Sequence, residues 1–366
     1  MIRLRRGIVR QVREVHPGLV EVAVDVEGRE EVALAYPALT GALHDGARVL
    51  LNTTAVAEGL GTGGYHFVMA VEEQGPIDPP PDGHVMKLRY TPLQAKVRAV
   101  AEQGSADRER IPDGLEGLPV VWAPLHSMVG AVCAGAKAAG AARVAYAMTD
   151  GAALPAWLSR QVHALRSAGL VDAVVTCGQA LGGDLEAISL FDGLLAARGV
   201  AGADAVVVAD GPGKVGTATK WGASDVASGT ALNAAGILEG RPVAALRLSF
   251  ADPSYRHHGV SPHSVTVLRE VTLVPVHVAV PSLDAERRGA VWEALKEARL
   301  EERHHLVEVT GQPAIDLLRD RGVPATTMGR SLDHDPAFFL AAGAAGVLAG
   351  RMAAGQSRWR QEAGTG

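Results

Sequence analysis

Short runs of alternating hydrophobic and polar residues occupy the first 72 positions of the chain. The clearest spans residues 19–26, where leucine and valine alternate with polar or small residues. A period of two places every second side chain on one face of a strand, so this pattern predicts a half-buried β-strand. Similar runs predict strands at 8–15, 31–36, 48–52 and 66–71. Five short strands without a helix favour a small all-β barrel of OB or SH3 type over residues 1–73.

A proline-rich segment follows this region. Residues 74–83 read QGPIDPPPDG, and four prolines exclude a helix or an interior strand. We therefore predict a linker over 74–83. Beyond it, residues 84–90 form a strand candidate, and Thr91, Pro92 and Gln94 match a capping box. That signature predicts a helix beginning at Pro92.

From residue 120 onwards, apolar runs of four to eight residues alternate with helical patterns. This alternation predicts right-handed β-α-β crossovers and a parallel sheet. We expect an α/β domain over 84–352, a three-layer structure whose mostly parallel sheet has flanking helices, followed by a polar tail over 353–366. The expected strands are 120–123, 143–148, 172–176, 204–209, 243–250, 274–280 and 306–310. The expected helices are 128–139, 154–168, 185–198, 228–238, 284–298, 314–321 and 337–352.

Composition narrows the class of protein. Hydrophobic residues make up 48% of the chain, enough for a large core, and the net charge of −5 argues against a general nucleic-acid binder. Cys133 and Cys177 are too few and too far apart for a disulfide framework or a zinc site, which suits a reducing compartment. The apolar stretch Ala337 to Gly350 is shorter than the roughly 20 residues of a membrane span. We expect a cytoplasmic protein with no membrane partner.

Ligands of open parallel sheets bind outside the carboxyl ends of the strands. Here, five successive strand ends carry polar or glycine-rich turns. Any single such turn could simply be solvated, but together they favour a ligand cleft. The ligand-binding candidates are His126, Thr149, Gly151, Gly178, Gln179, Asp184, Gly211, Gly213, Lys214, Gly216 and Thr217.

The segment Gly211 to Gly216 matches the pattern G-x-G-x-x-G after a strand. Glycines allow a backbone to approach a phosphate closely, and free N–H groups supply donors. The dinucleotide reading is weak, because no helix clearly opens at the third glycine and no acidic residue ends a strand about 20 residues later. The P-loop pattern also fails, since Lys214 precedes Gly216. Contact with an anion and a plain tight turn both remain open.

The densest group of histidines comprises His257, His258 and His263. With Asp150 or Asp252, these imidazoles are the catalytic candidates, because they can exchange protons near neutral pH. Their spacing matches no specific metal motif, so we assign no metal. A metal site completed by Asp252, contact with an anionic ligand and a solvated loop are the alternatives.

Three further residues have a structural and a chemical reading. Cys177 follows a strand, where a nucleophile could lie, but a buried structural cysteine is the preferred reading. Ser127 follows His126 without a G-x-S-x-G elbow, so a hydrolase triad has little support. Asp335 precedes Pro336, and we prefer to read it as the N-cap of the last helix.

The chain contains, in this order, the segments AYPALTG (35–41), LLNTTAVAEGLGTGGYHFV (50–68), GHVMKLRYTPLQ (83–94), LHSM (125–128), MTDGAALP (148–155), TCGQALGGDLEA (176–187), GPGKVGT (211–217), RHHGVSPH (256–263) and TMGRSLDHDPAFFLAAGAAG (327–346). In these segments and their order it resembles the uncharacterised bacterial family known as domain of unknown function 3866. The resemblance covers almost the whole chain, and it implies no activity, substrate or catalytic residue.

The leading hypothesis from the sequence is an enzyme of hydrolase or transferase type that acts on a small anionic or phosphorylated molecule. The rival is a non-catalytic ligand sensor or scaffold protein. Nucleic-acid binding by the barrel is not favoured, although Arg3, Arg5, Arg6, Arg10 and Arg13 cluster there, because few aromatic residues are present for base stacking. The sequence leaves the cofactor unknown and a homo-oligomer open.

Overall fold

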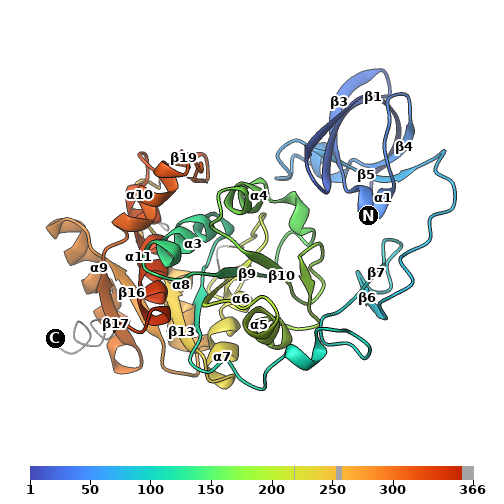
Figure 1. Ribbon diagram of the computed structural model, residues 1–366. Helices are drawn as coiled ribbons and strands as arrows, with labels where there is room; N and C mark the ends of the chain where they lie inside the picture. Colours follow the sequence, from blue (N-terminus) through green and yellow to red (C-terminus); the bar gives the residue numbers. More distant parts are fainter. Residues whose placement is uncertain (218, 253–257, 357–366) are drawn as a thin grey trace. The chain divides into compact units, whose positions relative to one another are not determined.

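The computed structural model describes residues 1–217, 219–252 and 258–356. Contacts divide the chain into two compact units, Met1–Val97 and Arg98–Gly366 (Figure 1).

The first unit contains a closed five-stranded barrel in the order β1-β2-β3-β5-β4. All five predicted strands are confirmed. Neighbouring strands are antiparallel except β3 and β5, which pair in parallel. Bulges bend the long β1 around the barrel, whose interior is filled mainly by valines. The strands are β1 (Leu4–His16), β2 (Leu19–Val26), β3 (Arg29–Ala35), β4 (Arg48–Asn52) and β5 (His66–Val71), with short helices α1 (Pro37–Thr40) and α2 (Thr54–Ala57) between them.

The proline-rich segment 74–83 is exposed and has no helix or strand. After it, the structure has a hairpin of β6 (Val85–Lys87) and β7 (Ala95–Val97). The predicted helix at Pro92 is therefore wrong. Leu88 and Tyr90 have positive φ angles, and the Thr91 hydroxyl donates to the Leu88 carbonyl, so the residues that mimic a capping box close a turn instead.

The second unit is built on an eight-stranded parallel sheet in the order β11-β10-β9-β12-β8-β13-β16-β17. The predicted α/β class is confirmed. The strands are β8 (Pro119–Trp122), β9 (Val144–Thr149), β10 (Ala173–Thr176), β11 (Leu185–Glu186), β12 (Ala205–Asp210), β13 (Arg241–Ala245), β16 (His277–Pro281) and β17 (His305–Val309). Two small hairpins, β14 (Leu248–Ser249) with β15 (Gly259–Val260) and β18 (Thr326–Thr327) with β19 (Arg330–Ser331), lie outside the sheet.

Helices cover both faces of this sheet (Figure 1). One face packs on α3 (Val129–Ala138), α4 (Arg160–Ser167), α10 (Gln312–Asp320) and α11 (Pro336–Ala353). The other packs on α5 (Leu190–Gly199), α7 (Thr230–Ile237), the end of α8 (Pro262–Thr266) with its π-helical continuation Val267–Val271, and α9 (Ala285–Glu297); α6 (Ser224–Ser228) precedes α7. The helix predicted over 185–198 begins later, at Leu190, because Leu185 and Glu186 form the edge strand β11.

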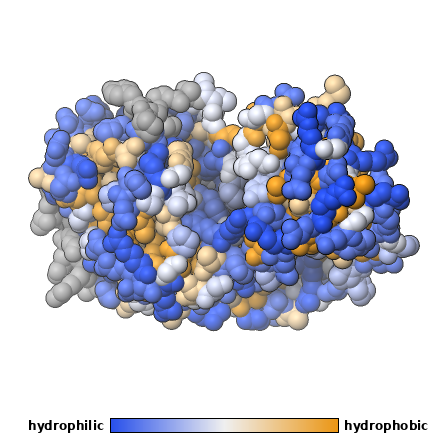
Figure 2. Space-filling view, turned by 90° about the horizontal axis from the view of Figure 1, so that it is seen from above, coloured by the Kyte–Doolittle hydropathy of each residue, from blue (hydrophilic) through white to orange (hydrophobic). Residues whose placement is uncertain are grey.

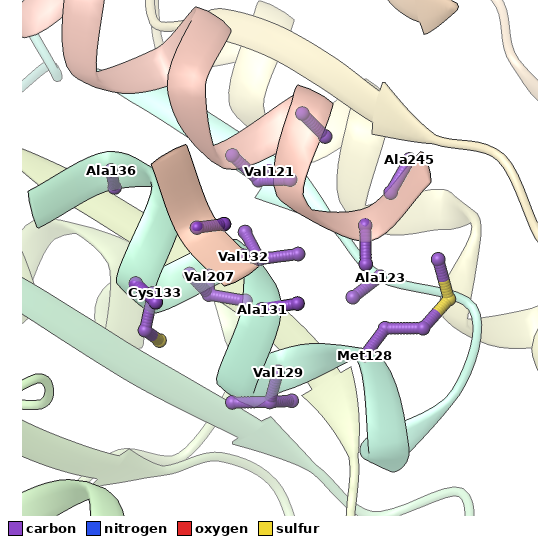
Figure 3. Packing of buried hydrophobic residues seen from close by; sticks show 14 of the residues in the cluster. Val121, Ala123, Met128, Val129, Ala131, Val132, Cys133, Ala136, Val207 and Ala245 are labelled. Atoms are coloured by element: carbon purple, nitrogen blue, oxygen red, sulfur yellow. The ribbon is translucent and has the colours of Figure 1, made fainter. Parts of the chain in front are cut away.

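Helix α11 is the central helix of its layer. It is long and apolar enough to cross a membrane, but 78% of its residues are buried within the unit. Figure 3 shows α3 packed against α11 above Val121 and Val207 of the sheet. On the face drawn in Figure 2, hydrophilic residues predominate and hydrophobic ones occur in small groups. Burial against protein thus accounts for the apolar character of α11; the cytoplasmic location stays a prediction.

The chain reverses its winding direction beside β8. After β8 it passes to α3 on one face, whereas after the neighbouring β12 it passes to α6 and α7 on the other. Loops that leave adjacent strands toward opposite faces open a crevice at the carboxyl edge, where ligands of such sheets bind. The topology therefore directs attention to the residues just after β8, β9 and β12.

Candidate functional site

A cavity of about 530 Å³ opens at this edge of the sheet. Its volume is within the usual range for small-molecule sites. The segments that line it follow β8, precede and begin α4, follow β12, and include the β18 hairpin. The lining residues are Leu125–Ser127, Leu158–Gln161, Gly211–Lys214, Pro324 and Thr326–Met328.

His126 lies in the wall of this cavity. Its Nδ1 is 3.2 Å from the carbonyl oxygen of Asp210 and 3.2 Å from the hydroxyl of Tyr146. Because a carbonyl only accepts, Nδ1 carries the hydrogen and donates it to Asp210, which leaves Nε2 as an acceptor. Burial lowers the pKa of His126 to about 4, against the opposing effect of the Asp210 carbonyl. The imidazole is therefore neutral at pH 7.

Ser159 faces the free nitrogen of this histidine. Its Oγ is 2.7 Å from Nε2 of His126, so the hydroxyl donates to the imidazole. The same oxygen accepts the N–H of Val162 and caps α4. Ser159 is buried, yet it lines the cavity together with Arg160 and Gln161. The amino end of α4, with its partial positive charge, therefore borders the cavity beside the Ser159 hydroxyl.

Asp210 connects three strand ends. Its backbone carbonyl orients His126, while its buried carboxylate accepts the Thr149 hydroxyl at 2.6 Å and the Gly151 N–H at 3.2 Å. The ends of β8, β9 and β12 are thereby fixed relative to one another. Such support holds the Ser159–His126 pair in one geometry.

Lys214 lines the cavity and has a buried ammonium group. Nζ is 3.6 Å from Oδ2 of Asp210, and both atoms are buried without a hydrogen-bond partner. Burial lowers the pKa of Lys214, while the charges of Asp225 and Asp210 oppose that shift. The buried ammonium therefore lies beside the buried carboxylate of Asp210.

The β18–β19 hairpin forms the rim opposite α4. The hydroxyls of Ser127 and Thr327 are 3.1 Å apart, which ties the hairpin to the residue next to His126. Met328, at the tip, is 61% exposed and has a φ of +47°, a conformation that is costly for a residue with a side chain. An apolar side chain is therefore presented at the mouth of the cavity.

The structure brings several predicted residues together. His126, Gly211, Gly213 and Lys214 line the one cavity. Thr149 and Gly151 lie just behind it, on the Asp210 carboxylate.

Other predicted residues lie in local structural contacts. Asp150 accepts the N–H of Gln179, and Gly178 leaves room for that carboxylate. Asp184 accepts the N–H of Val174 and pairs with Arg166. Gly216 bridges Ala223, and the Thr217 N–H donates to Gly222, so these two residues close an exposed loop of their own. None of these predicted residues lines the cavity: Asp150, Gly178, Gln179, Asp184, Gly216 and Thr217.

The described residues of the predicted histidine group make different local contacts. His257 lies outside the described residues, and His258 is exposed with its ring edge-on to Phe250. His263 is 4.0 Å from a carboxylate oxygen of Asp225. Asp252 pairs with Arg330 at 3.0 Å. Within the described ranges, no three histidine, cysteine or acidic side chains are placed to hold a metal ion.

The preferred readings of two other residues have different outcomes. Cys177 is buried, as predicted. Asp335 occupies the N-cap position of α11 but makes no capping hydrogen bond. Its carboxylate instead accepts from Arg330 and Ser249, so the N-cap reading is correct in position and wrong in its interaction.

Sequence reasoning missed Ser159 and Asp210. Ser159 lies inside the single helix predicted over 154–168, whereas the structure has a 3₁₀ turn at Ala156–Leu158 and starts α4 after Ser159. The signal was a serine followed by a helical pattern, which is typical of an N-cap. Its approach to His126, 33 positions away, leaves no trace in local sequence.

The search of curated proteins finds no match. The family model described as "Protein of unknown function (DUF3866)" matches residues 32–346, which exclude β1 and β2 of the barrel but include the whole cavity lining. The match agrees with the resemblance seen in the sequence, and it extends over most of the chain. The chain therefore belongs to the DUF3866 family.

Proposed function

We propose that the α/β unit is a serine-dependent hydrolase or acyltransferase that acts on a small, activated acyl compound with an anionic group. The observation that carries the proposal is the 2.7 Å approach of the Ser159 hydroxyl to Nε2 of His126 in the wall of the 530 Å³ cavity. A nucleophile, a base in contact with it and a third group that orients the base are the parts of such a site. Here the orienting group is the Asp210 carbonyl.

The chemistry follows from these positions. Oγ of Ser159 attacks the substrate carbonyl carbon while its proton passes to Nε2 of His126, and the carbonyl electrons move onto oxygen. The amino end of α4 faces the resulting oxyanion. Collapse breaks the bond to the leaving group, which takes the proton from Nε2. Water then releases the acyl group in a hydrolase, or a second substrate does so in a transferase.

The surroundings of the base restrict the substrate. A histidine whose pKa is about 4 is a weak base, so it removes a proton efficiently only when the rest of the reaction is favourable. Thioesters and activated esters suit such a site better than amides. Arg160 supports an anionic group on the substrate, because it is exposed at the start of α4, lines the cavity and carries a guanidinium.

A fluorophosphonate probe followed by intact-mass measurement tests the proposal. We expect a single adduct on the wild type and none on Ser159→Ala, with hydrolysis of p-nitrophenyl esters falling at least about a thousandfold in that variant. Ser189→Ala is the matched control, since Ser189 caps α5 in the same way but lies outside the cavity. It loses a helix cap, worth about 1 kcal/mol, without losing the nucleophile.

The sensor alternative rests on the capping role of Ser159. If Ser159 is only the cap of α4, both serine variants lose similar stability and the wild type takes up no probe. Ligand binding in the cavity without turnover of any ester or thioester would then favour the sensor.

A further inference from the structure

The barrel has a second, smaller cavity at one of its mouths. Its volume is about 220 Å³, and it lies where β1 begins, β2 turns into β3 and β5 begins. The lining residues are Arg3, Val26, Glu27, Arg29, Glu31 and His66. Barrel mouths are frequent ligand positions. A water molecule occupies about 30 Å³ in the liquid, so the space suits several waters or a small oxyanion.

The arginines of the barrel divide into two groups. Five form ion pairs with acidic side chains: Arg5, Arg6, Arg10, Arg13 and Arg48. Arg3 and Arg29 form none within the described part of the chain, and both line the small cavity. The guanidinium of Arg3 donates to the Thr53 hydroxyl, and Arg29 is exposed. The two arginines of the barrel that lack an acidic partner therefore both lie at this mouth.

Both acidic residues of the lining have a partner within the barrel. Glu27 forms an ion pair with Arg5 at 2.8 Å, and Glu31 accepts a hydrogen bond from Nε2 of His66. His66 is buried, with only 3% of its surface exposed, and its Nδ1 has no hydrogen-bond partner within the described residues. A buried polar atom without a partner costs free energy and is a common sign of a missing water or ion.

We propose that this mouth of the barrel binds a phosphate group, with Arg3 and Arg29 as its charged ligands and His66 below them. A guanidinium presents paired N–H donors that match two oxygens of a phosphate. The group could belong to a free phosphomonoester or to a nucleic-acid backbone; both present the same oxygens. The site is separate from the serine-histidine cavity and independent of the function proposed for it.

Titration calorimetry of the full chain with inorganic phosphate is the first measurement. We expect Arg29→Gln to weaken phosphate binding at least tenfold, and Arg3→Gln/Arg29→Gln to abolish it. Arg6→Gln is the charge-matched control, because Arg6 is on the same barrel, 81% exposed and paired with Glu72. It should change the dissociation constant less than twofold. Arg29 makes no side-chain hydrogen bond or ion pair within the described residues, whereas Arg3→Gln removes the bond to Thr53. If the double variant is unstable, the single Arg29→Gln variant therefore decides.

Competition experiments identify the source of the phosphate. Displacement of phosphate by a phosphomonoester but not by a short single-stranded RNA supports a small-molecule ligand. Displacement by the RNA, lost in the Arg29 variant, supports a nucleic-acid backbone. The proposal is overturned if the wild type binds no phosphate at millimolar concentration, or if Arg6→Gln weakens binding as much as Arg29→Gln does. Ser159→Ala should leave all these values unchanged, so failure of one proposal is distinguishable from failure of the other.

Discussion

Replacement of Gly346 by alanine tests how closely α3 and α11 are packed. A Cβ atom on Gly346 would lie 2.0 Å from the carbonyl oxygen of Val132, 2.8 Å from its carbon and 3.0 Å from the nitrogen of Ala136. All three atoms belong to the backbone of α3, so no side-chain rotation relieves the clash. Carbon and oxygen atoms that are not bonded to each other normally stay at least about 3.3 Å apart, so the two helices must separate by roughly 1 Å.

The energetic cost follows from this displacement. A gap of 0.5 to 1 Å forfeits about a quarter to a half of the dispersion energy between the atoms that face it, and overpacked cores lose about 1–3 kcal/mol. Alanine gains about 1 kcal/mol over glycine within a helix, which offsets part of the loss. Helix α3 is buried along almost its whole length, so many contacts are affected. Because the clash is with backbone atoms, the loss belongs at the upper end of this range, and we expect Gly346→Ala to lower the free energy of unfolding by about 2 kcal/mol net.

Gly289→Ala is the matched control. Gly289 lies in the exposed middle of α9, and a Cβ atom there would meet nothing within 4 Å. The same chemical change should therefore raise the free energy of unfolding by about 0.5–1 kcal/mol. Urea unfolding followed by tryptophan fluorescence suits the comparison, because all five tryptophans occur at position 122 or later. Equal effects of the two substitutions, or a Gly346 variant as stable as the wild type, would refute the close packing of α3 on α11.

Three further expectations concern pH and the cavity rim. If His126 is the base, kcat/KM for an ester rises as the pH increases through about 4 and is constant from about pH 6 upwards, because burial keeps the imidazole neutral. A fall in kcat/KM that begins near pH 6.5 on acidification would contradict the buried position of this base. The pKa of His277 is lowered to about 4 by burial and by the neighbouring His305, so the folded state favours its neutral form. That contribution to stability, at most about 3 kcal/mol, is complete above pH 6.5 and is lost as pH falls from 6.5 to 4; His277→Gln should flatten this part of a stability–pH curve, and an unchanged slope would count against it. Met328→Gly should relieve the left-handed strain and open the cavity mouth, raising KM for long acyl chains about threefold or more with little change for acetyl esters, as steady-state kinetics on a chain-length series would show.

Local pattern determined most of the fold. The period-two runs of the first 72 residues and the strand-helix alternation after residue 120 predicted the barrel and the parallel sheet, because burial on one face leaves a regular trace in sequence. The segment 91–94 misled, since Thr and Pro favour both a helix start and a turn. Only the backbone conformation of Leu88 and Tyr90, set by the hairpin, decided between the two.

The candidate site depended on contacts that the sequence does not record. The rule that ligands lie at the carboxyl ends of strands led to His126, Gly211, Gly213 and Lys214. It could not give the strand order, and the order places β8 beside β12, so that the carbonyl of Asp210 orients His126. It could not show that Ser159 reaches His126 or that the ammonium of Lys214 lies beside the buried carboxylate of Asp210. Pattern in the sequence specifies which face of an element is buried, whereas the meeting of side chains from different strand ends is decided by how the elements pack.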